Sequence, residues 1–225
     1  MSKTLYIIVF NFQALCMVLS FFLSLRLIRN SKIPYYMKGF YWYPIVGILV
    51  LVPNFIDLNI SRIFHPVSVI IINASILFHF IFLSLFIIKL IKNKSNQNLL
   101  NIIFWSILLL LFLSLNKENL TKNNNLGYSV SNFGLIIFCI LYYYQLFNSL
   151  PNMNLKKEPS FWIVTGIFFT MSVHIPIQAA VGFLRYNISY NNYILLYGII
   201  AFCYSIMHLF LIKAFICATH QRKAI

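Results

Sequence analysis

Long apolar runs separated by short polar breaks organise this chain. A helix that crosses the hydrocarbon core of a bilayer, which is roughly 30 Å thick, needs about 20 apolar residues. Seven runs of that kind predict helices over Leu5 to Ile28, Lys38 to Ile56, Val67 to Ile91, Leu99 to Leu115, Leu126 to Leu150, Ser160 to Leu184 and Tyr193 to Cys217. Because the breaks are short, we expect residues 1–225 to form one transmembrane domain.

The composition agrees with this pattern. The chain is 61% hydrophobic and only 9% charged, and its mean hydropathy is +0.84. Such a chain carries too little charge to cover a soluble globule. Backbone groups in lipid must be paired within a helix or a closed barrel, and long unbroken apolar runs favour the helix over the alternating strands of a barrel. We therefore predict an all-α integral membrane bundle of seven transmembrane helices.

The charged residues give an orientation. Seventeen Lys and Arg face three acidic residues, for a net charge of +14, but the basic residues lie singly or in small groups at the ends of apolar runs. This placement excludes a nucleic-acid interface and indicates topology signals and contacts with lipid head groups. Alternate connections hold twelve and five of the 17 basic residues. Since inner loops retain positive charge, the amino terminus is expected outside and the carboxyl terminus inside.

Catalytic and metal-binding signatures are missing from the sequence. Its four cysteines lie inside apolar runs without CxxC spacing, at Cys16, Cys139, Cys203 and Cys217, which favours small packing residues over disulfides or a zinc site. No HExxH or GxSxG motif and no carboxylate at mid-helix accompany the histidines. Lys213 lies too near a helix end to form a retinal Schiff base. We predict no enzyme activity, no cofactor and no metal.

The run Ser160 to Leu184 carries the strongest candidate site. Its second half contains Ser172, His174, Pro176 and Gln178, and polar side chains at membrane depth are costly and often functional. His174 and Gln178 are four residues apart and therefore share one helical face. Pro176 frees a backbone carbonyl near Ser172. The pattern predicts either a ligand site at mid-depth or a purely structural kink.

Further polar residues in other runs extend the candidate site. They are His79 and Asn73 in Val67 to Ile91, His208 in Tyr193 to Cys217, and Asn11, Gln13 and Gln145. The three histidines can converge only if their helices are neighbours. Each is interpreted either as a neutral imidazole bonded to an adjacent helix or as a ligand contact or proton-sensitive switch.

Aromatic residues gather near the start of the second run. Tyr35, Tyr36, Tyr41, Trp42 and Tyr43 precede or begin it. Because Tyr and Trp favour the interface between membrane and water, we expect these side chains to be anchors. An aromatic cage for a cation is the alternative.

Several similar segments are interpreted either as an internal repeat or as chance matches between apolar sequences. The matches pair Asn59-Ile60-Ser61 with Asn187-Ile188-Ser189, His79 with His208, Trp42 and Gly47 with Trp162 and Gly166, and Pro53 with Pro176. The first three and the last three predicted helices run in the same directions. A parallel 3+1+3 arrangement with Leu99 to Leu115 as linker is therefore possible.

A resemblance to a known family rests on LYYYQLFNSL and KEPSFWIVTGIFFTMS. An aromatic-rich fifth helix and a P-x-F-W-I-x-x-G start of the sixth resemble a family of small seven-helix membrane proteins of Bacteroidetes; the matching residues here are Pro159, Phe161, Trp162, Ile163 and Gly166. The resemblance covers the C-terminal part of the chain, and the rest only by helix count and spacing. It implies a companion of two-component sensor kinases, with a membrane histidine kinase as partner. Pro159, Trp162 and Gly166 are expected to be structural, as is Pro176, which lies outside the motif.

These observations predict a sensory or signalling protein of the bacterial inner (cytoplasmic) membrane. It would change helix packing around Ser160 to Leu184 and pass the change to a membrane partner. A small-solute carrier of the 3+1+3 type is the alternative, and it predicts a water-accessible central cavity lined by polar residues such as Asn73, His79, His174 and Gln178. An assembly subunit of a larger membrane complex is a third hypothesis.

Overall fold

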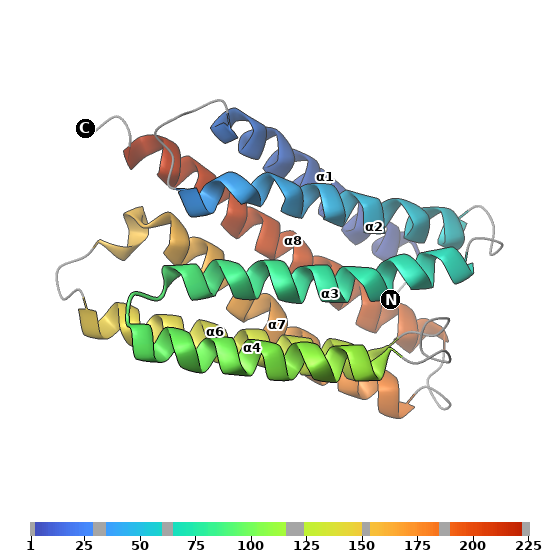
Figure 1. Ribbon diagram of the computed structural model, residues 1–225. Coiled ribbons are helices and arrows are strands. Elements are labelled where there is room, and N and C mark those ends of the chain that lie inside the picture. The colour runs from blue at the N-terminus through green and yellow to red at the C-terminus, as the bar shows by residue number, and fades with distance from the viewer. Residues whose placement is uncertain are drawn as a thin grey trace.

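The fold is helical. The computed structural model describes residues 3–28, 35–59, 65–115, 124–149, 154–184 and 190–221, and within them every regular element is a helix. The α-helices are α1 (Lys3–Ile28), α2 (Trp42–Asn59), α3 (His65–Leu90), α4 (Lys94–Ser114), α6 (Asn125–Ser149), α7 (Pro159–Leu184) and α8 (Tyr190–Gln221); the 3₁₀ helices are η1 (Tyr35–Tyr41) and η3 (Leu155–Lys157) (Figure 1). The predicted all-α class is confirmed.

Six of these helices are long and apolar enough to cross a membrane. The spans contain 21 to 25 residues with mean hydropathies of 1.5 to 2.4, at Leu5–Arg26, Val67–Leu90, Lys94–Ser114, Asn125–Asn148, Pro159–Ala180 and Leu195–Thr219. The apolar stretch around the start of α2, Gly39–Val52, is shorter. The chain is therefore a multi-pass membrane protein by the length and composition of its helices.

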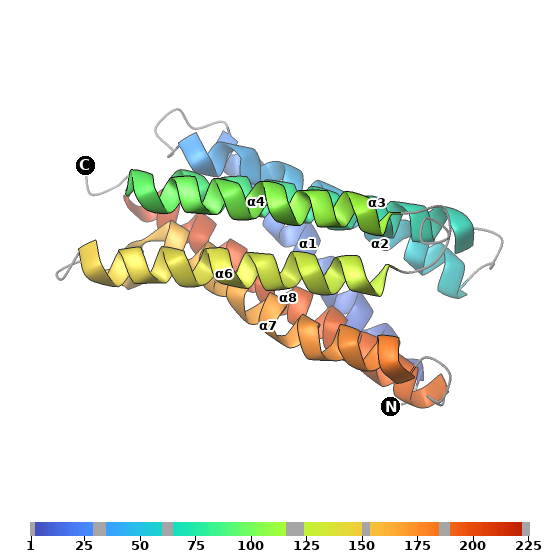
Figure 2. The same cartoon turned by 60° about the horizontal axis from the view of Figure 1, so that its bottom comes forward.

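Successive α-helices run in opposite directions along a common axis (Figures 1 and 2). α1 packs against α2, α2 against α3, α3 against α6, α6 against α7, and α7 against α8, which returns to α1. α4 lies outside this ring of six helices and contacts α3 and α6. Residues that lie far apart in the sequence therefore meet inside the ring.

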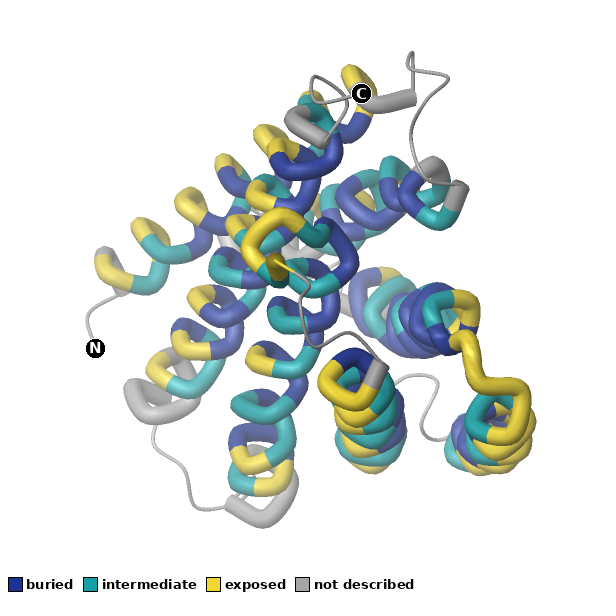
Figure 3. The backbone as a smooth tube through the Cα atoms, turned by 90° about the vertical axis from the view of Figure 1, so that its left-hand side faces the viewer, coloured by how far each residue is buried: buried dark blue, intermediate teal, exposed yellow. Residues whose placement is uncertain are grey.

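The outward faces of the helices are apolar. Figure 3 looks along the bundle, where buried positions turn inward and exposed positions outward. On α4 the exposed side chains include Ile102, Trp105, Leu109 and Leu113, each more than 60% exposed. In water so large an apolar surface would drive aggregation, whereas in a bilayer it is the face that lipid solvates.

An aromatic core fills one half of the bundle, between the middle of α3 and its C-terminal end. Phe40 of η1 lies edge-to-face against Phe86, with ring centroids 4.6 Å apart. Phe80 of α3 stacks on Phe104 of α4 at 5.7 Å and meets Phe138 of α6 edge-on at 6.4 Å. Phe40, Phe80 and Phe138 are fully buried. This layer fixes η1, α3, α4 and α6 relative to one another.

Side-chain caps begin two of the helices. Asn93 accepts a hydrogen bond from the backbone N–H of Ser95 at the start of α4. Asn124 precedes α6 and accepts from the N–H of Gly127 at 2.9 Å. Such caps satisfy backbone donors that the first helical turn leaves without partners. The backbone N–H of Asn124 also donates to the side-chain oxygen of Asn73 on α3 at 3.3 Å, so this hydrogen bond connects α3 to the start of α6.

Candidate functional site

Three histidines and two tyrosines form a continuous chain of rings across the bundle. The order is His208, Tyr43, His79, Tyr204 and His174, and the successive ring centroids are 5.9, 5.1, 6.4 and 4.9 Å apart. We call these five residues the histidine–tyrosine chain. They come from α2, α3, α7 and α8. The structure thus brings the three predicted histidines together, with a tyrosine between each successive pair.

At one end of this chain His208 is hydrogen-bonded to α1. The Ser20 hydroxyl lies 2.9 Å from His208 Nδ1, and both side chains are buried. The same hydroxyl donates its hydrogen to the carbonyl of Met17 at 2.8 Å. A hydroxyl has one hydrogen to donate, so Nδ1 is the donor to Ser20, and Nε2 is the ring nitrogen without a hydrogen. We refer to this as the closed end.

Tyr43 lies much deeper than the sequence predicted. We expected an interfacial anchor, but its side chain is 1% exposed, and its hydroxyl donates to the sulfur of Met207 at 3.2 Å. The prediction is wrong because η1 continues the helical path of α2 toward the end of the bundle. Its Phe40 packs against Phe82 and Phe86 of α3. Tyr43 is therefore held at the level of His79, while Trp42 beside it remains 50% exposed.

His174 forms the other end of the chain, and one of its nitrogens has no partner. The ring meets Tyr204 edge-on, and the side-chain amide nitrogen of Asn132 on α6 lies 3.4 Å from His174 Nδ1. Because an amide NH₂ only donates, Nδ1 accepts and Nε2 carries the hydrogen. His174 is 1% exposed, and Nε2 has no hydrogen-bond partner within the described part of the chain. We refer to this as the open end.

An unpaired buried N–H is costly and therefore informative. Leaving one buried donor without an acceptor costs about 1–3 kcal/mol, and native structures leave few such groups. A water molecule or a ligand that presents an oxygen acceptor to Nε2 would remove this cost. Among the described residues, His174 Nε2 and the Ser84 hydroxyl are the buried side-chain polar atoms without a hydrogen-bond partner.

The buried amide side chains share one half of the bundle with the open end. Every buried Asn or Gln of the described residues lies toward the end at which α1, α3 and α6 begin and α7 ends: Gln13, Asn73, Asn124, Asn132 and Gln178. We call this the amide half; the aromatic core fills the other. Gln178 lies one turn beyond His174 on α7. The amide half offers hydrogen-bonding groups between the end of the bundle and His174.

The other predicted site residues have varied surroundings. Asn73 is buried and its side-chain oxygen accepts from the backbone of Asn124, so it has a structural link. Ser172 is partly buried, and Pro176 is exposed on α7. The two Asn-Ile-Ser segments of the proposed repeat lie at residues 59–61 and 187–189, and they fall outside the described residues apart from the backbone of Asn59.

The motif at the start of α7 makes packing contacts. Trp162 donates from its indole nitrogen to the carbonyl of Lys156 at 2.9 Å, and its ring stacks on Phe210 of α8 at 5.9 Å. The ammonium of Lys213 lies 5.8 Å from the Trp162 ring. A side-chain carbon added at Gly166 would lie 2.9 Å from Phe210 Cβ. These contacts join the first half of α7 to α8.

A second polar network lies at the opposite end of α7 from the amide half. The Glu158 carboxylate accepts from the Ser160 hydroxyl at 2.8 Å and from the Tyr36 hydroxyl at 3.3 Å. Since Ser160 donates to Glu158, the hydroxyl of Tyr142, 2.9 Å away, donates to Ser160. Burial, together with the adjacent Glu158 carboxylate, raises the pKa of Tyr36. This Glu158 network joins η1, α6 and the start of α7.

Sequence reasoning missed Tyr43, Tyr204, Ser20 and Asn132. Of these four residues, Tyr204 was the easiest to predict from the sequence, because it precedes His208 by four residues and shares its helical face. Ser20 and Asn132 are short polar residues in apolar runs, and nothing in the sequence identifies the helix that each one faces. Within the described residues, no group of three His, Cys, Asp or Glu side chains is arranged to hold a metal ion.

Comparison with known proteins adds no functional assignment: no protein-family model, no curated protein and no solved structure matches this chain.

Proposed function

We propose that the chain is a seven-helix sensory or signalling protein of the bacterial inner membrane, in which a small molecule bearing an oxygen acceptor binds at the open end of the histidine–tyrosine chain. The observation that carries this proposal is the unpaired, buried Nε2 of His174. Binding there would change the packing of α7, and a membrane partner would receive the change. The resemblance of the C-terminal part to companions of sensor kinases supports a histidine kinase as that partner.

The contacts of the histidine–tyrosine chain support a role in transmitting a conformational change between helices. Its five residues and their two end partners, Ser20 and Asn132, come from α1, α2, α3, α6, α7 and α8. These are the six helices of the ring. A ligand shifts a conformational equilibrium only through contacts that differ between states. A ligand that bonds His174 would change the contacts of the histidine–tyrosine chain. Since this chain and its end partners connect all six helices, the change would reach each of them.

The charges of the described residues support an orientation with the amide half outside. Every described Lys or Arg side chain lies in or near the opposite end: Arg26, Lys89, Lys92, Lys94, Lys156, Lys157 and Lys213. We call this the basic end, and the positive-inside rule assigns it to the cytoplasm. The amino terminus is then outside and the carboxyl terminus inside. Epitope tags on each terminus test this, because an externally accessible carboxyl-terminal tag contradicts it.

The seventh span is proposed for η1 and α2 together. Helical residues 39–59 have a combined length of about 33 Å, from the rises of 3₁₀ and α-helices, which matches the hydrocarbon thickness. Tyr43 then lies inside the bilayer, in agreement with its burial. An odd number of spans places the two termini on opposite sides of the membrane.

A small-solute carrier remains the second proposal, because the helix contacts favour the 3+1+3 arrangement. In such a repeat, a two-fold relation exchanges α1 with α6, α2 with α7 and α3 with α8. The contact of α3 with α6 then corresponds to the contact of α8 with α1, and both contacts are present. α4 lies outside the ring, as a linker helix would. Failure of the two halves to superpose would remove this support.

Purification of the full chain in mild detergent, followed by mass spectrometry of bound small molecules and proteins, tests the proposal. His174→Phe keeps the ring volume and removes the Nε2 donor. The matched control is His208→Phe, which changes the histidine at the closed end. We expect the wild type and His208→Phe to retain a small molecule that His174→Phe loses, and all three to retain a histidine kinase.

Two results would count against signalling. Recovery of the same small molecules from wild type and His174→Phe would contradict the site. Solute uptake into proteoliposomes that His174→Phe abolishes, without any bound kinase, would favour the carrier.

A further inference from the structure

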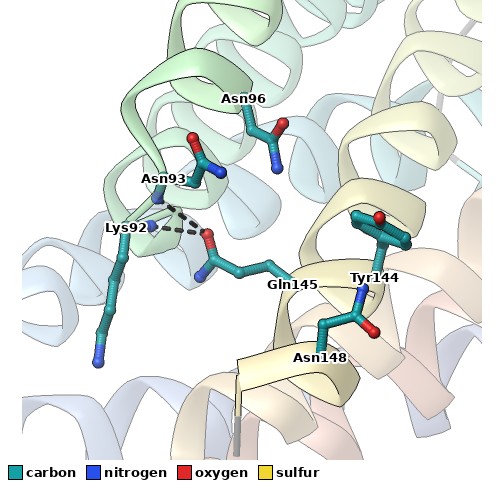
Figure 4. Close-up of a pocket in the computed structure, with 6 residues that line it drawn as sticks. All are labelled: Lys92, Asn93, Asn96, Tyr144, Gln145 and Asn148. Atoms are coloured by element: carbon teal, nitrogen blue, oxygen red, sulfur yellow. Dashed lines mark hydrogen bonds between the residues drawn. The ribbon is translucent and has the colours of Figure 1, made fainter.

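A polar depression lies at the basic end, between the turn that joins α3 to α4 and the last turns of α6. Its volume is about 510 Å³, and it is lined by Lys92, Asn93, Asn96, Tyr144, Gln145 and Asn148 (Figure 4). This lining includes no residue of the histidine–tyrosine chain or of the Glu158 network. The depression is therefore separate from both the histidine–tyrosine chain and the Glu158 network.

Gln145 builds the floor of this depression by holding the turn in place. Its side-chain oxygen accepts from the backbone N–H groups of Lys92 at 2.8 Å and Asn93 at 3.3 Å. Its amide nitrogen donates to the carbonyl of Leu90 at 3.4 Å. Three hydrogen bonds of one side chain thus join α6 to the turn between α3 and α4, and they hold in place the backbone that carries Lys92 and Asn93.

Lys92 and the amide nitrogens supply donors around the opening, and the side-chain oxygens of Asn96 and Asn148 are acceptors (Figure 4). The Asn93 oxygen is used by the N–H of Ser95, and Figure 4 shows the amide nitrogens of Asn93 and Asn96 turned toward the depression, with Lys92 extending outward from the turn. The lining contains a lysine, amides and a phenol but no carboxylate. Donors without a negative group favour an anion with several oxygen acceptors, such as a phosphate.

The surface beside the depression is suited to acyl chains. Leu99 is one turn from Asn96 on α4 and is 47% exposed, and Ile140 is one turn from Tyr144 on α6 and is 52% exposed. Both lie on the side of the depression toward the middle of the helices. A molecule that combines a phosphate with hydrocarbon chains would therefore contact polar and apolar groups at their matching depths.

We propose that this depression binds the phosphate of an anionic phospholipid head group. The side-chain amides of Asn93 and Asn96 donate to phosphate oxygens, Lys92 adds positive charge at the edge of the depression, and the acyl chains follow Leu99 and Ile140 along α4 and α6. Basic pockets between membrane helices on the cytoplasmic side commonly hold such head groups. The bound lipid would hold α4, the helix outside the ring, against α6.

The test uses the purified full chain in a neutral detergent, titrated with short-chain phosphatidylglycerol and followed by native mass spectrometry. Asn96→Asp adds a negative charge inside the depression, and Asn98→Asp adds the same charge two residues further along α4, outside the lining. We expect Asn96→Asp to weaken phosphatidylglycerol binding about tenfold and Asn98→Asp by less than about twofold. Lys92→Gln should weaken binding more than Lys94→Gln, which is the matched loss of charge outside the lining.

Controls distinguish a lipid from a free phosphate and from diffuse attraction. Thermal unfolding that matches the wild type verifies that each variant is folded. Weak binding of zwitterionic short-chain phosphatidylcholine, and no displacement of phosphatidylglycerol by millimolar inorganic phosphate, support the proposal. Equal losses for Asn96→Asp and Asn98→Asp would overturn it in favour of general surface charge, and displacement by inorganic phosphate would overturn the lipid as the ligand.

Discussion

Replacement of Gly166 by alanine tests the close packing of α7 against α8. An added Cβ at Gly166 would lie 2.9 Å from Phe210 Cβ, 3.4 Å from Phe210 Cγ and 3.5 Å from the carbonyl oxygen of Met207. The nearest atom is attached directly to the backbone of α8, so a side-chain rotation cannot move it away. Gly166→Ala therefore requires the two helices to separate by several tenths of an ångström.

Two opposing effects set the size of the change. Overpacking of a close interface costs about 1–3 kcal/mol, and alanine regains as much as about 1 kcal/mol over glycine inside a helix. Because the contact with Phe210 Cβ is only 2.9 Å, the overpacking cost lies in the upper part of its range, at about 2–3 kcal/mol, and the net loss is about 1–2 kcal/mol. For a chain of 225 residues, at about 2–4 °C for each kcal/mol, the Tm should fall by about 2–8 °C.

Thermal unfolding of the purified chain in mild detergent measures this effect. The control is Gly39→Ala in η1, where the added Cβ would lie 3.7 Å from Phe82 Cε2, at an ordinary contact distance. We expect a Tm for the control that is unchanged or raised by up to about 4 °C, because the gain in helix propensity is not opposed by a close contact. A Tm for Gly166→Ala at or above that of the wild type would refute the reasoning, because helix propensity would then outweigh the contact.

Three further predictions concern hydrogen bonds. Ser20→Ala leaves the Nδ1 donor of His208 unpaired and should lower the free energy of unfolding by about 1–3 kcal/mol. The control is Ser24→Ala, because the Ser24 hydroxyl donates to a carbonyl of its own helix, and this variant should leave the free energy of unfolding almost unchanged. Equal losses in the two variants would contradict the pairing of Ser20 with His208. Asn124→Ala removes the cap of α6 and should cost about 1 kcal/mol in a denaturation assay, whereas Asn124→Asp, which keeps an acceptor at the cap, should recover most of it; a loss of the same size in both would contradict the capping role. Because the pKa of Tyr36 is raised in the folded state from its ordinary value of 10.0, its neutral form contributes stability that is complete below about pH 10 and is lost above it. The Tm of the wild type should thus fall more steeply between pH 10 and 12 than that of Tyr36→Phe, and parallel slopes would contradict this assignment.

The helices were predictable because lipid imposes strict requirements on the backbone. A span must be helical and long, so six of the seven predicted runs each fell on one long helix, whereas Lys38 to Ile56 fell on η1 and α2. The polar residues inside the runs could be recognised by their cost. His79, His174 and His208 were found in this way. A histidine in the middle of an apolar run can be recognised from that run alone, without knowledge of the neighbouring helices.

The neighbours of each residue were not predictable for a related reason. In a soluble bundle the polar face of a helix points to water and so reveals the buried face. Here both the lipid-facing and the inward faces are apolar, and the sequence did not indicate that Asn132 faces His174 or that Ser20 faces His208. Tyr43 was misassigned because its side chain faces the interior of the bundle, beside His79 and Met207, and nothing in the aromatic-rich segment indicates which of its rings turns inward.

α7 connects the proposed ligand site to the basic end. Pro176 has no N–H to donate to the carbonyl of Ser172, so the missing hydrogen bond spans residues 172–176 and weakens the helix around His174. From Ser172 back to Ser160 no proline interrupts α7, and this part is joined to α8 at Gly166 and to α6 through the hydrogen bond from Tyr143 to Thr165. A ligand that reorients His174 would therefore displace this part as one body. The displacement would reach the Glu158 network at the basic end, where Tyr36 and Tyr142 attach η1 and α6.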